Sequence, residues 1–555
     1  MNTNPASSLP VRSGRRPFTP VLLCCGLLLL TLCDRPVVPP TVVQIDPVQQ
    51  KYQDWLAREK NAIPELREIL EDERIADFRL RTHALLAAGR IGASELAPQM
   101  MRLLKDDPHP AVKNCAVIAL VDLQHTAALP LMLSFLPGGK RAEDSIDRTI
   151  LLEHLGRMGD ERAIPALIDA LGSEGVQERL KAQNALVELK STAAIEPLLE
   201  LHARDREGRF DKEVAVVLGA IQHPRSGPAL LRLVRRPESR GRIAAVNGVG
   251  ALEYAPAESA LLNILRLQRS READLLTRQT GRALAALNLA GSVAPLIALF
   301  DAPSLSLRLV AAETLSEMTV PGIAGKALGR LKGRDRAVVI PAAFVLGMKK
   351  HAPASELLRS LYQKYDGPEA FYTAQALGRI GDRESIPLFL EALHKRVGEP
   401  AYGAAFALGA MKAKEAVEPM IAVLASNTRD LSLKKHCVAA LGEIGDPRAA
   451  AAIIALPLAE KIEMGDLAGR ALGKLGGPEV FAFLEGSIRS EDVNERRVAR
   501  LTLIHFHDPD RVDFFLGLLQ DQDPKTRRAA MTALRKNTGK NLGTEQEWVD
   551  WADAR

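Results

Sequence analysis

A short phrase returns along the chain at intervals of roughly thirty residues, and this repeat constrains the fold more than any other feature. The phrase reads LGRMGD at residues 155–160, LGRIGD at 377–382 and LGEIGD at 441–446. With degenerate copies, the anchors are Ala88, Leu120, Leu155, Leu186, Leu218, Val249, Leu287, Leu315, Leu346, Leu377, Leu408, Leu441, Leu472, Leu503 and Leu534. A fixed period in this range is typical of a solenoid, whose units bury their apolar faces against their neighbours.

Proline follows the same period. Ten prolines fall roughly ten residues after an anchor, or where an anchor would stand: Pro64, Pro98, Pro130, Pro165, Pro197, Pro228, Pro295, Pro353, Pro387 and Pro419. A proline inside a helix costs ~3 kcal/mol, whereas the first helical turn tolerates it. Each of these positions is therefore predicted to lie near a helix start.

Each unit can be interpreted as two helices. Asp446-Pro447 has the residues of a helix N-cap and first turn, and Asp523-Pro524 has the same pair before a second helix. The glycine after the anchor falls in the last turn of this second helix, and a later glycine such as Gly381 suits a left-handed C-terminal cap. The unit is therefore a helix, a short turn, a second helix and a loop.

The unit resembles the short bacterial HEAT-like repeat, also called the phycobilisome-lyase-type HEAT repeat, over residues 52–540. Composition agrees, because 47% of the chain is hydrophobic but only 4% is aromatic, which favours closely packed layers of small aliphatic residues. We predict an all-α solenoid, a superhelix of about 15 HEAT-like helical hairpins. The resemblance implies a fold but no single activity, since the family includes chromophore lyases, a di-iron hydroxylase and scaffolds without chemistry.

Both ends of the array carry tryptophan. Trp55 lies in the first amphipathic segment, and Trp548 and Trp551 lie in a C-terminal segment at residues 541–555. Residues three apart share a helix face, so the last two tryptophans can cover the terminal layer. An aromatic recognition patch is the functional alternative.

The first 33 residues resemble an export signal. Arg12, Arg15 and Arg16 precede an apolar run over residues 21–33, which is short for a membrane span and suits a signal peptide. An uncleaved anchor is the alternative, and Arg15-Arg16 also resembles a twin-arginine signal. We therefore expect export to the periplasm or to a membrane-anchored position in a bacterial cell envelope.

The end of the apolar run resembles a lipoprotein cleavage box. The sequence LTLC at residues 30–33 makes Cys33 a candidate for lipidation, although Leu32 stands where a small residue is usual. Residues 34–51 contain four prolines and are predicted to form a semi-extended tether. Membrane contact would then run through the signal or through a lipid on Cys33.

Two cysteines lie within the repeats, Cys115 and Cys437. They are about ten units apart, and stacked helices advance roughly 10 Å per layer, whereas a disulfide needs Cα atoms within about 7 Å. We predict that they do not pair and that each fills a small position in the packed layers.

A search for chemistry finds no catalytic, metal-binding or cofactor-binding motif, so no cofactor is predicted. His505 and His507 are two residues apart and cannot share a helix face, which argues against a metal pair. The sequence contains no His-Glu dipeptide, which the di-iron members of the family use as ligands. A lyase-type enzyme or an enzyme-accessory protein remains the alternative function.

The charge of the chain argues against nucleic acid as a partner and is compatible with a protein partner. The formal net charge is only +5, and three of these charges lie in the signal. A basic residue recurs near the start of the second helix of eight units: Lys113, Arg148, Lys181, Lys212, Arg242, Arg308, Arg497 and Arg528. These side chains predict either a ladder of ion pairs between repeats or a groove for an acidic partner.

One local cluster of arginines is the candidate partner-binding site. It comprises Arg225, Arg232, Arg235, Arg236, Arg240 and Arg242, with Glu238 as the one acid among them. Such a cluster could bind an acidic protein or anionic head groups, although charge runs are usually solvated surface. The sequence thus favours a non-enzymatic protein-binding scaffold or adaptor of the cell envelope, with a structural spacer as a further alternative.

Overall fold

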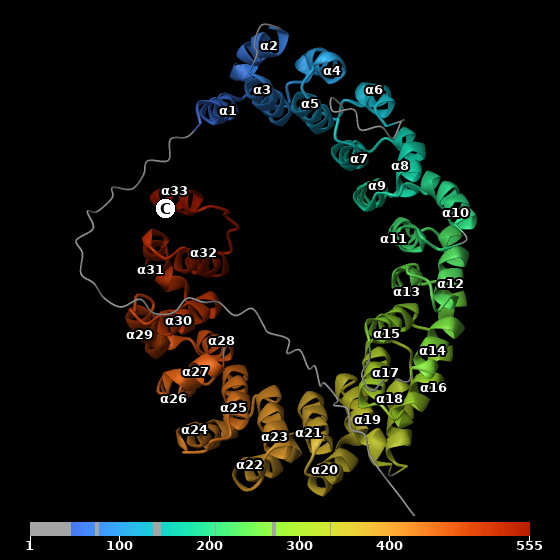
Figure 1. Cartoon of the computed structure of the whole chain (residues 1–555). Coiled ribbons are helices and arrows are strands. Elements are labelled where there is room, and N and C mark those ends of the chain that lie inside the picture. The colour runs from blue at the N-terminus through green and yellow to red at the C-terminus, as the bar shows by residue number, and fades with distance from the viewer. Residues whose placement is uncertain are drawn as a thin grey trace, which may run out of the picture.

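The computed structural model describes residues 46–72, 77–136, 146–205, 207–268, 274–333, 335–464 and 466–555. All regular structure within these ranges is helical. The helices alternate between an outer and an inner layer of a long curved array (Figure 1). This confirms the predicted α-solenoid.

The outer layer contains one helix from each of fifteen hairpins in the described ranges. These are α2 (Ile63–Glu71), α4 (Ala97–Asp106), α6 (Leu129–Ser134), α8 (Ile164–Leu171), α10 (Ile195–Arg204), α12 (Gly227–Arg235), α14 (Glu258–Leu267), α16 (Ala290–Ala298), α18 (Ile323–Leu331), α20 (Ser355–Lys364), α22 (Ile386–Lys395), α24 (Val417–Ala425), α26 (Ala449–Ile454), α29 (Gly477–Ser487) and α31 (Val512–Gly517). Short 3-10 turns lead into most of them.

The inner layer contains the second helix of each hairpin and lines the concave side of the array (Figure 1). These are α3 (Phe78–Ile91), α5 (Pro110–Asp122), α7 (Arg148–Arg157), α9 (Val176–Leu189), α11 (Asp211–Ile221), α13 (Arg242–Ala251), α15 (Leu275–Leu287), α17 (Leu305–Glu317), α19 (Arg336–Met348), α21 (Pro368–Ile380), α23 (Glu399–Ala410), α25 (Leu431–Ile444), α28 (Asp466–Leu475), α30 (Val493–His505) and α32 (Pro524–Thr538). Successive inner helices pack against one another along the array.

Every predicted anchor lies in an inner helix, one in each. One register was wrong: Leu284, and not Leu287, holds the anchor position of α15. Gly250 of the preceding inner helix packs against Ala283, just before Leu284, as the equivalent glycines do in other units. Leu287 lies one helical turn later on the same buried face, so apolar spacing could not separate the two.

The glycine after the anchor lets neighbouring inner helices approach closely. A Cβ atom built on Gly378 would lie 2.6 Å from the Cα atom of Ala407 in the next inner helix. The same contact, at 2.5 to 2.9 Å, recurs between successive inner helices at Gly89 and Ala119, Gly156 and Ala185, Gly250 and Ala283, Gly347 and Ala376, Gly409 and Ala440, and Gly442 and Ala471. The recurrent phrase therefore records a packing requirement.

The helix boundaries follow the predicted signals. Pro165 is the second residue of α8, and Asp523 caps α32 by accepting a hydrogen bond from the backbone N–H of Lys525 (2.9 Å). Gly381 ends α21 with φ +84°, the left-handed conformation predicted for it. Pro295 is the exception, because α16 begins at Ala290 and places this proline inside the helix.

Three further helices lie outside the hairpins. They are α1 (Pro47–Arg58), α27 (Leu458–Glu463), inserted before α28, and α33 (Glu545–Asp553). Trp55 on α1 and Trp548 on α33 are fully buried, and Trp551 contacts Trp548 edge to face at 5.6 Å. The tryptophans therefore act as caps on the terminal layers.

The N-terminal predictions lie largely outside the described residues. Helix α1 starts at Pro47, inside the segment predicted as a tether, whereas the signal at residues 1–33 and Cys33 are not described. Among the helices that are described, none combines the length and the apolar character needed to cross a bilayer.

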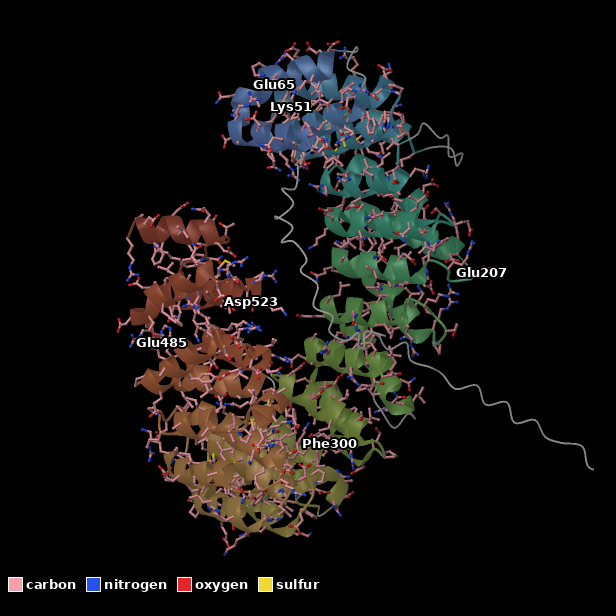
Figure 2. The ribbon with its side chains drawn as sticks, turned by 60° about the vertical axis from the view of Figure 1, so that its left-hand side comes forward. Lys51, Glu65, Glu207, Phe300, Glu485 and Asp523 are labelled. Atoms are coloured by element: carbon pink, nitrogen blue, oxygen red, sulfur yellow. The ribbon has the colours of Figure 1, made fainter. Side chains whose placement is uncertain are left out.

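The array curls so that its C-terminal arm lies across from its N-terminal arm (Figure 1). Figure 2 labels Lys51 and Glu65 at the N-terminal end of the curve, and Asp523 and Glu485 in the C-terminal arm. The inner helices therefore present one continuous concave surface to any molecule held within the curve.

The concave surface as a candidate binding site

One stripe of side chains on each inner helix faces the inside of the curve. On α21 this stripe is Phe371, Gln375 and Arg379, spaced four residues apart and half-buried, whereas the positions around Leu377 are buried. The other sides of α21 are covered by α19, α20 and α23. We call the positions six and two residues before the anchor and two residues after it the concave stripe.

Aromatic side chains gather on or directly beside the stripes of α19 to α25. The residues are Phe344, Phe371, Tyr372, Arg379, Tyr402, Phe406 and His436, and we call them the aromatic–arginine surface. All are half-buried, so none belongs to the fully buried core. Because only 4% of the chain is aromatic, this concentration over four helices is a local departure from the aliphatic design of the repeats.

Arg379 lies at the centre of this surface. Its guanidinium carbon is 5.6 Å from the ring centroid of Phe344 and 5.6 Å from that of Phe406, which belong to the preceding and following inner helices. Its Nη1 donates a hydrogen bond to Oε1 of Gln375 (2.9 Å), and no acid of the described chain forms an ion pair with it. Burial lowers the pKa of Arg379. A guanidinium that lies between two rings and has no ion-pair partner among the described residues can bind a carboxylate of a partner by donating hydrogen bonds to it.

The neighbouring aromatic rings are held rigidly. Tyr402 and His436 stack with centroids 5.1 Å apart and an interplanar angle of 1°, and Phe371 meets His436 edge to face at 6.0 Å. The Tyr402 hydroxyl donates to Oδ1 of Asp430 (2.9 Å), and burial together with this carboxylate raises the pKa of Tyr402. Ordered rings lose little conformational freedom on binding, which favours recognition.

The stripes of the last three units are basic. Five exposed cations lie on α28, α30 and α32, and we call them the basic surface: Arg470, Lys474, Arg497, Arg528 and Lys536. Asp466 is the one acid on the same stripes. Lys474 forms an ion pair with Glu443 of α25 (2.5 Å), and the other four cations form none with described residues.

Four of the eight recurrent basic residues found in the sequence fall into two groups. Arg148 lies 3.3 Å from Glu178, and Lys181 lies 2.5 Å from Glu153, so both pairs join α7 to α9 as a ladder between repeats. Arg497 and Arg528 instead belong to the exposed basic surface. The two ion pairs between repeats and the exposed basic side chains thus occupy different parts of the array.

Sequence reasoning missed the arginines that close three of the hairpins. Arg179, Arg496 and Arg527 each donate from Nη1 to a backbone carbonyl six residues earlier, at 2.8, 2.5 and 2.9 Å. These bonds fix the turn between the outer and inner helix of the same unit. The signal was present, since each arginine lies beside or near a basic residue that the sequence analysis selected.

The residues of the arginine cluster differ in their contacts. Arg225 pairs with Glu196 (2.5 Å), Arg236 lies 3.3 Å from Glu238, and Arg242 donates from Nε to the carbonyl of Val234 (3.0 Å). Arg232, Arg235 and Arg240 are exposed and form no ion pair with described residues.

The described residues offer few groups suited to metal binding or to nucleophilic chemistry. No set of three His, Cys, Asp or Glu side chains there could hold a metal ion, and His505 and His507 form no such set. Cys115 and Cys437 are both free thiols, as predicted, and Cys437 is fully buried. Burial raises the pKa of Cys115 to about 11 and that of Cys437 to about 12, which suppresses the reactive thiolate.

Comparison with protein families identifies the repeat. The description "HEAT repeats" matches residues 63–143, and "PBS lyase HEAT-like repeat" matches residues 147–173, 371–395, 400–426 and 433–456. No curated protein matches the sequence. Together with the stacked hairpins, these matches support HEAT-like repeats in the chain.

Solved structures show the same architecture. Kap121p bound to Ste12p has a TM-score of 0.54 and 12% identity, and the alignment covers 91% of this chain and 68% of Kap121p. Kap121p bound to Pho4p gives 0.53 with the same identity and coverage, and Kap121p alone gives 0.52 over 92% of this chain and 69% of its own. At this identity the likeness concerns the fold.

Proposed function

We propose that the chain is a non-enzymatic protein-binding scaffold or adaptor, and that the aromatic–arginine surface is its main docking site. The observation that carries this proposal is Arg379, which lies between Phe344 and Phe406 and forms no ion pair with an acid of the described residues. Aromatic side chains, tyrosine among them, and arginine contribute most of the binding energy at protein interfaces. A surface that gathers them without burying them fits a partner protein.

The architecture supports this function. A curved array exposes side chains from many repeats, so a partner can bind across several of them at once. Kap121p, which shares the fold, is known bound to the proteins Ste12p and Pho4p. The same use of an open helical array is proposed for this chain.

The proposed location is the bacterial cell envelope, reached through the signal at residues 1–33. Membrane attachment would follow from lipidation of Cys33, with the proline-rich segment as a tether. Fractionation of cells that produce the Cys33→Ala variant tests the anchor. Release into the soluble fraction supports lipidation. Unchanged membrane association of the variant excludes Cys33 lipidation as the anchor.

The exposed part of the arginine cluster is a second proposed contact. Arg232, Arg235 and Arg240 are free of described ion pairs, so an acidic protein or anionic head groups could bind them. Replacing all three by glutamate would weaken that contact and leave binding at the concave surface unchanged.

Affinity capture with variants tests the main docking site. The chain is purified from its own cells with and without the substitutions Phe371→Ala, Arg379→Gln and Phe406→Ala. These side chains are half-buried, so circular dichroism must first show an unchanged helical spectrum. The matched control is Val397→Ser, which changes an 84% exposed apolar residue in the loop between α22 and α23.

The expected result is that one dominant protein accompanies the wild-type chain and the control, and that the triple variant retains less than about a tenth of it, as expected for loss of hot-spot residues. Equal recovery with the triple variant would show that the concave aromatic residues are not the docking site.

A further inference from the structure

The concave surface changes character along the array, from aromatic to basic. The stripes of α19, α21 and α23 carry the rings around Arg379, and the stripes of α28, α30 and α32 carry the basic surface. Helix α25 lies between them and contributes Lys435 and Glu443. The two surfaces are therefore neighbours on one continuous face.

The cations of the basic surface lie close enough to affect one another. His505, on the stripe of α30, has a lowered pKa because of burial and the nearby charges of Arg470, Lys536 and Lys474. Burial and then Lys474 lower the pKa of Lys536. Like charges held together disfavour one another and concentrate a positive potential on the concave side.

We propose that the basic surface binds an extended acidic segment of the partner protein. Carboxylates of this segment pair with Arg470, Arg497 and Arg528, and an apolar residue of the same segment reaches the rings around Arg379. The inference rests on the proposed function, because it assumes that the partner is a protein docked at the aromatic–arginine surface.

Spacing along the array defines the segment further. Neighbouring helices lie roughly 10 Å apart and an extended chain advances about 3.3 Å per residue. Two steps separate α28 from α32, so the acidic part spans about six residues. Three steps separate α21 from α28, so the apolar residue lies about nine residues from the acidic part.

A polypeptide fits this face better than a nucleic acid or an anionic membrane. Asp466 and Glu443 lie among the cations and would repel a continuous row of phosphates, whereas a peptide can place uncharged residues opposite them.

Fluorescence anisotropy with a synthetic peptide tests the inference. The probe is a labelled peptide with a run of about six glutamates and a phenylalanine about nine residues away, following the spacing above. The full chain is compared with the double variant Arg497→Glu and Arg528→Glu. The control makes the same charge change at Lys326→Glu and Lys414→Glu, which are exposed on the outer layer.

We expect salt-sensitive binding by the wild-type chain and the control, and at least about tenfold weaker binding by the double variant. Wild-type affinity in the double variant would overturn the inference. So would binding of an oligothymidylate or of phosphatidylglycerol vesicles in place of the peptide.

The two proposals fail separately. If the aromatic variants lose the captured partner but the glutamate peptide does not bind, the scaffold function stands and the acidic segment is wrong. If the aromatic variants still capture the partner, the proposed docking site is wrong. The acidic-segment proposal then fails with it, because it assumes that docking site.

Discussion

Glycine and alanine determine how closely the inner helices stack. At Gly378 the facing atoms are the Cα, Cβ and carbonyl oxygen atoms of Ala407, so a methyl group has no flexible neighbour to displace. Glycine inside a helix costs up to ~1 kcal/mol relative to alanine, and the array accepts this cost in many of its units. Close backbone contact over many layers compensates for it through packing.

Gly378→Ala should therefore destabilise the chain by about 1–3 kcal/mol, because overpacking forces α21 and α23 apart. The matched control is Gly329→Ala in α18, where a Cβ atom would have no neighbour within 4 Å. The control should stabilise by up to ~1 kcal/mol, since alanine is the better helix former. Urea unfolding followed by circular dichroism measures both. A stabilising effect at Gly378 would refute the close contact.

The two thiols give a prediction about pH. Burial raises the pKa of Cys437 to about 12 and that of Cys115 to about 11. Near pH 8 the thiolate fraction is then only about one in a thousand for Cys115 and lower for Cys437. Iodoacetamide should label Cys115 slowly and Cys437 hardly at all, and the Cys115 rate should rise about tenfold per pH unit below pH 11. Peptide mass spectrometry reads each site, and rapid native labelling of Cys437 would contradict its burial.

At the scale of the helix, most inner elements begin with a side-chain cap or a proline, and several end at a glycine. Much of this could be predicted from the sequence, because caps and prolines act locally: Asp523, Pro165 and Gly381 all hold their predicted positions. The anchor of α15 could not be placed, because apolar spacing alone does not choose between Leu284 and Leu287.

The candidate site was harder to predict than the helices. Phe344 and Phe406 both lie two residues before an anchor, so the concave stripe was readable in principle. Placing Arg379 between their rings requires the stacking distance and twist of adjacent units, which come from packing across repeats. The arginine cluster drew attention instead because it is contiguous in sequence.

The cap of α32 gives a prediction at this scale. Asp523 has a lowered pKa because it accepts a backbone hydrogen bond from Lys525 and lies near Arg500, although partial burial opposes the shift. A lowered folded-state pKa stabilises the helix above the unfolded value of about 3.9 and loses that effect as pH falls through the folded pKa. Asp523→Ala should cost about 0.5–2 kcal/mol near pH 7 and less near pH 3.

Asp523→Asn is the matched control, since asparagine caps a helix as well as aspartate but carries no charge. It should lie between wild type and the alanine variant near pH 7. Hydrogen exchange of the first turn of α32 measures all three chains, and equal protection in all of them would show that the cap contributes nothing.

The whole molecule is an open array with two arms, and its shape is a direct consequence of stacking. A compact protein of the length of residues 46–555 would have a radius of gyration of about 24 Å. The array encloses no single central core, so small-angle X-ray scattering should give a value well above this. A measured radius near 24 Å would mean that the hairpins do not stack in sequence.

Site-specific photo-crosslinking tests the central claim most directly, because it asks which face of the array meets the partner. A benzophenone side chain is placed at Met348, 46% exposed on the concave stripe of α19, and at Leu267, 61% exposed at the end of the outer helix α14. The account predicts a discrete protein adduct from Met348 and none from Leu267. Adducts from Leu267 alone, or equal adducts from both, would contradict a concave docking surface.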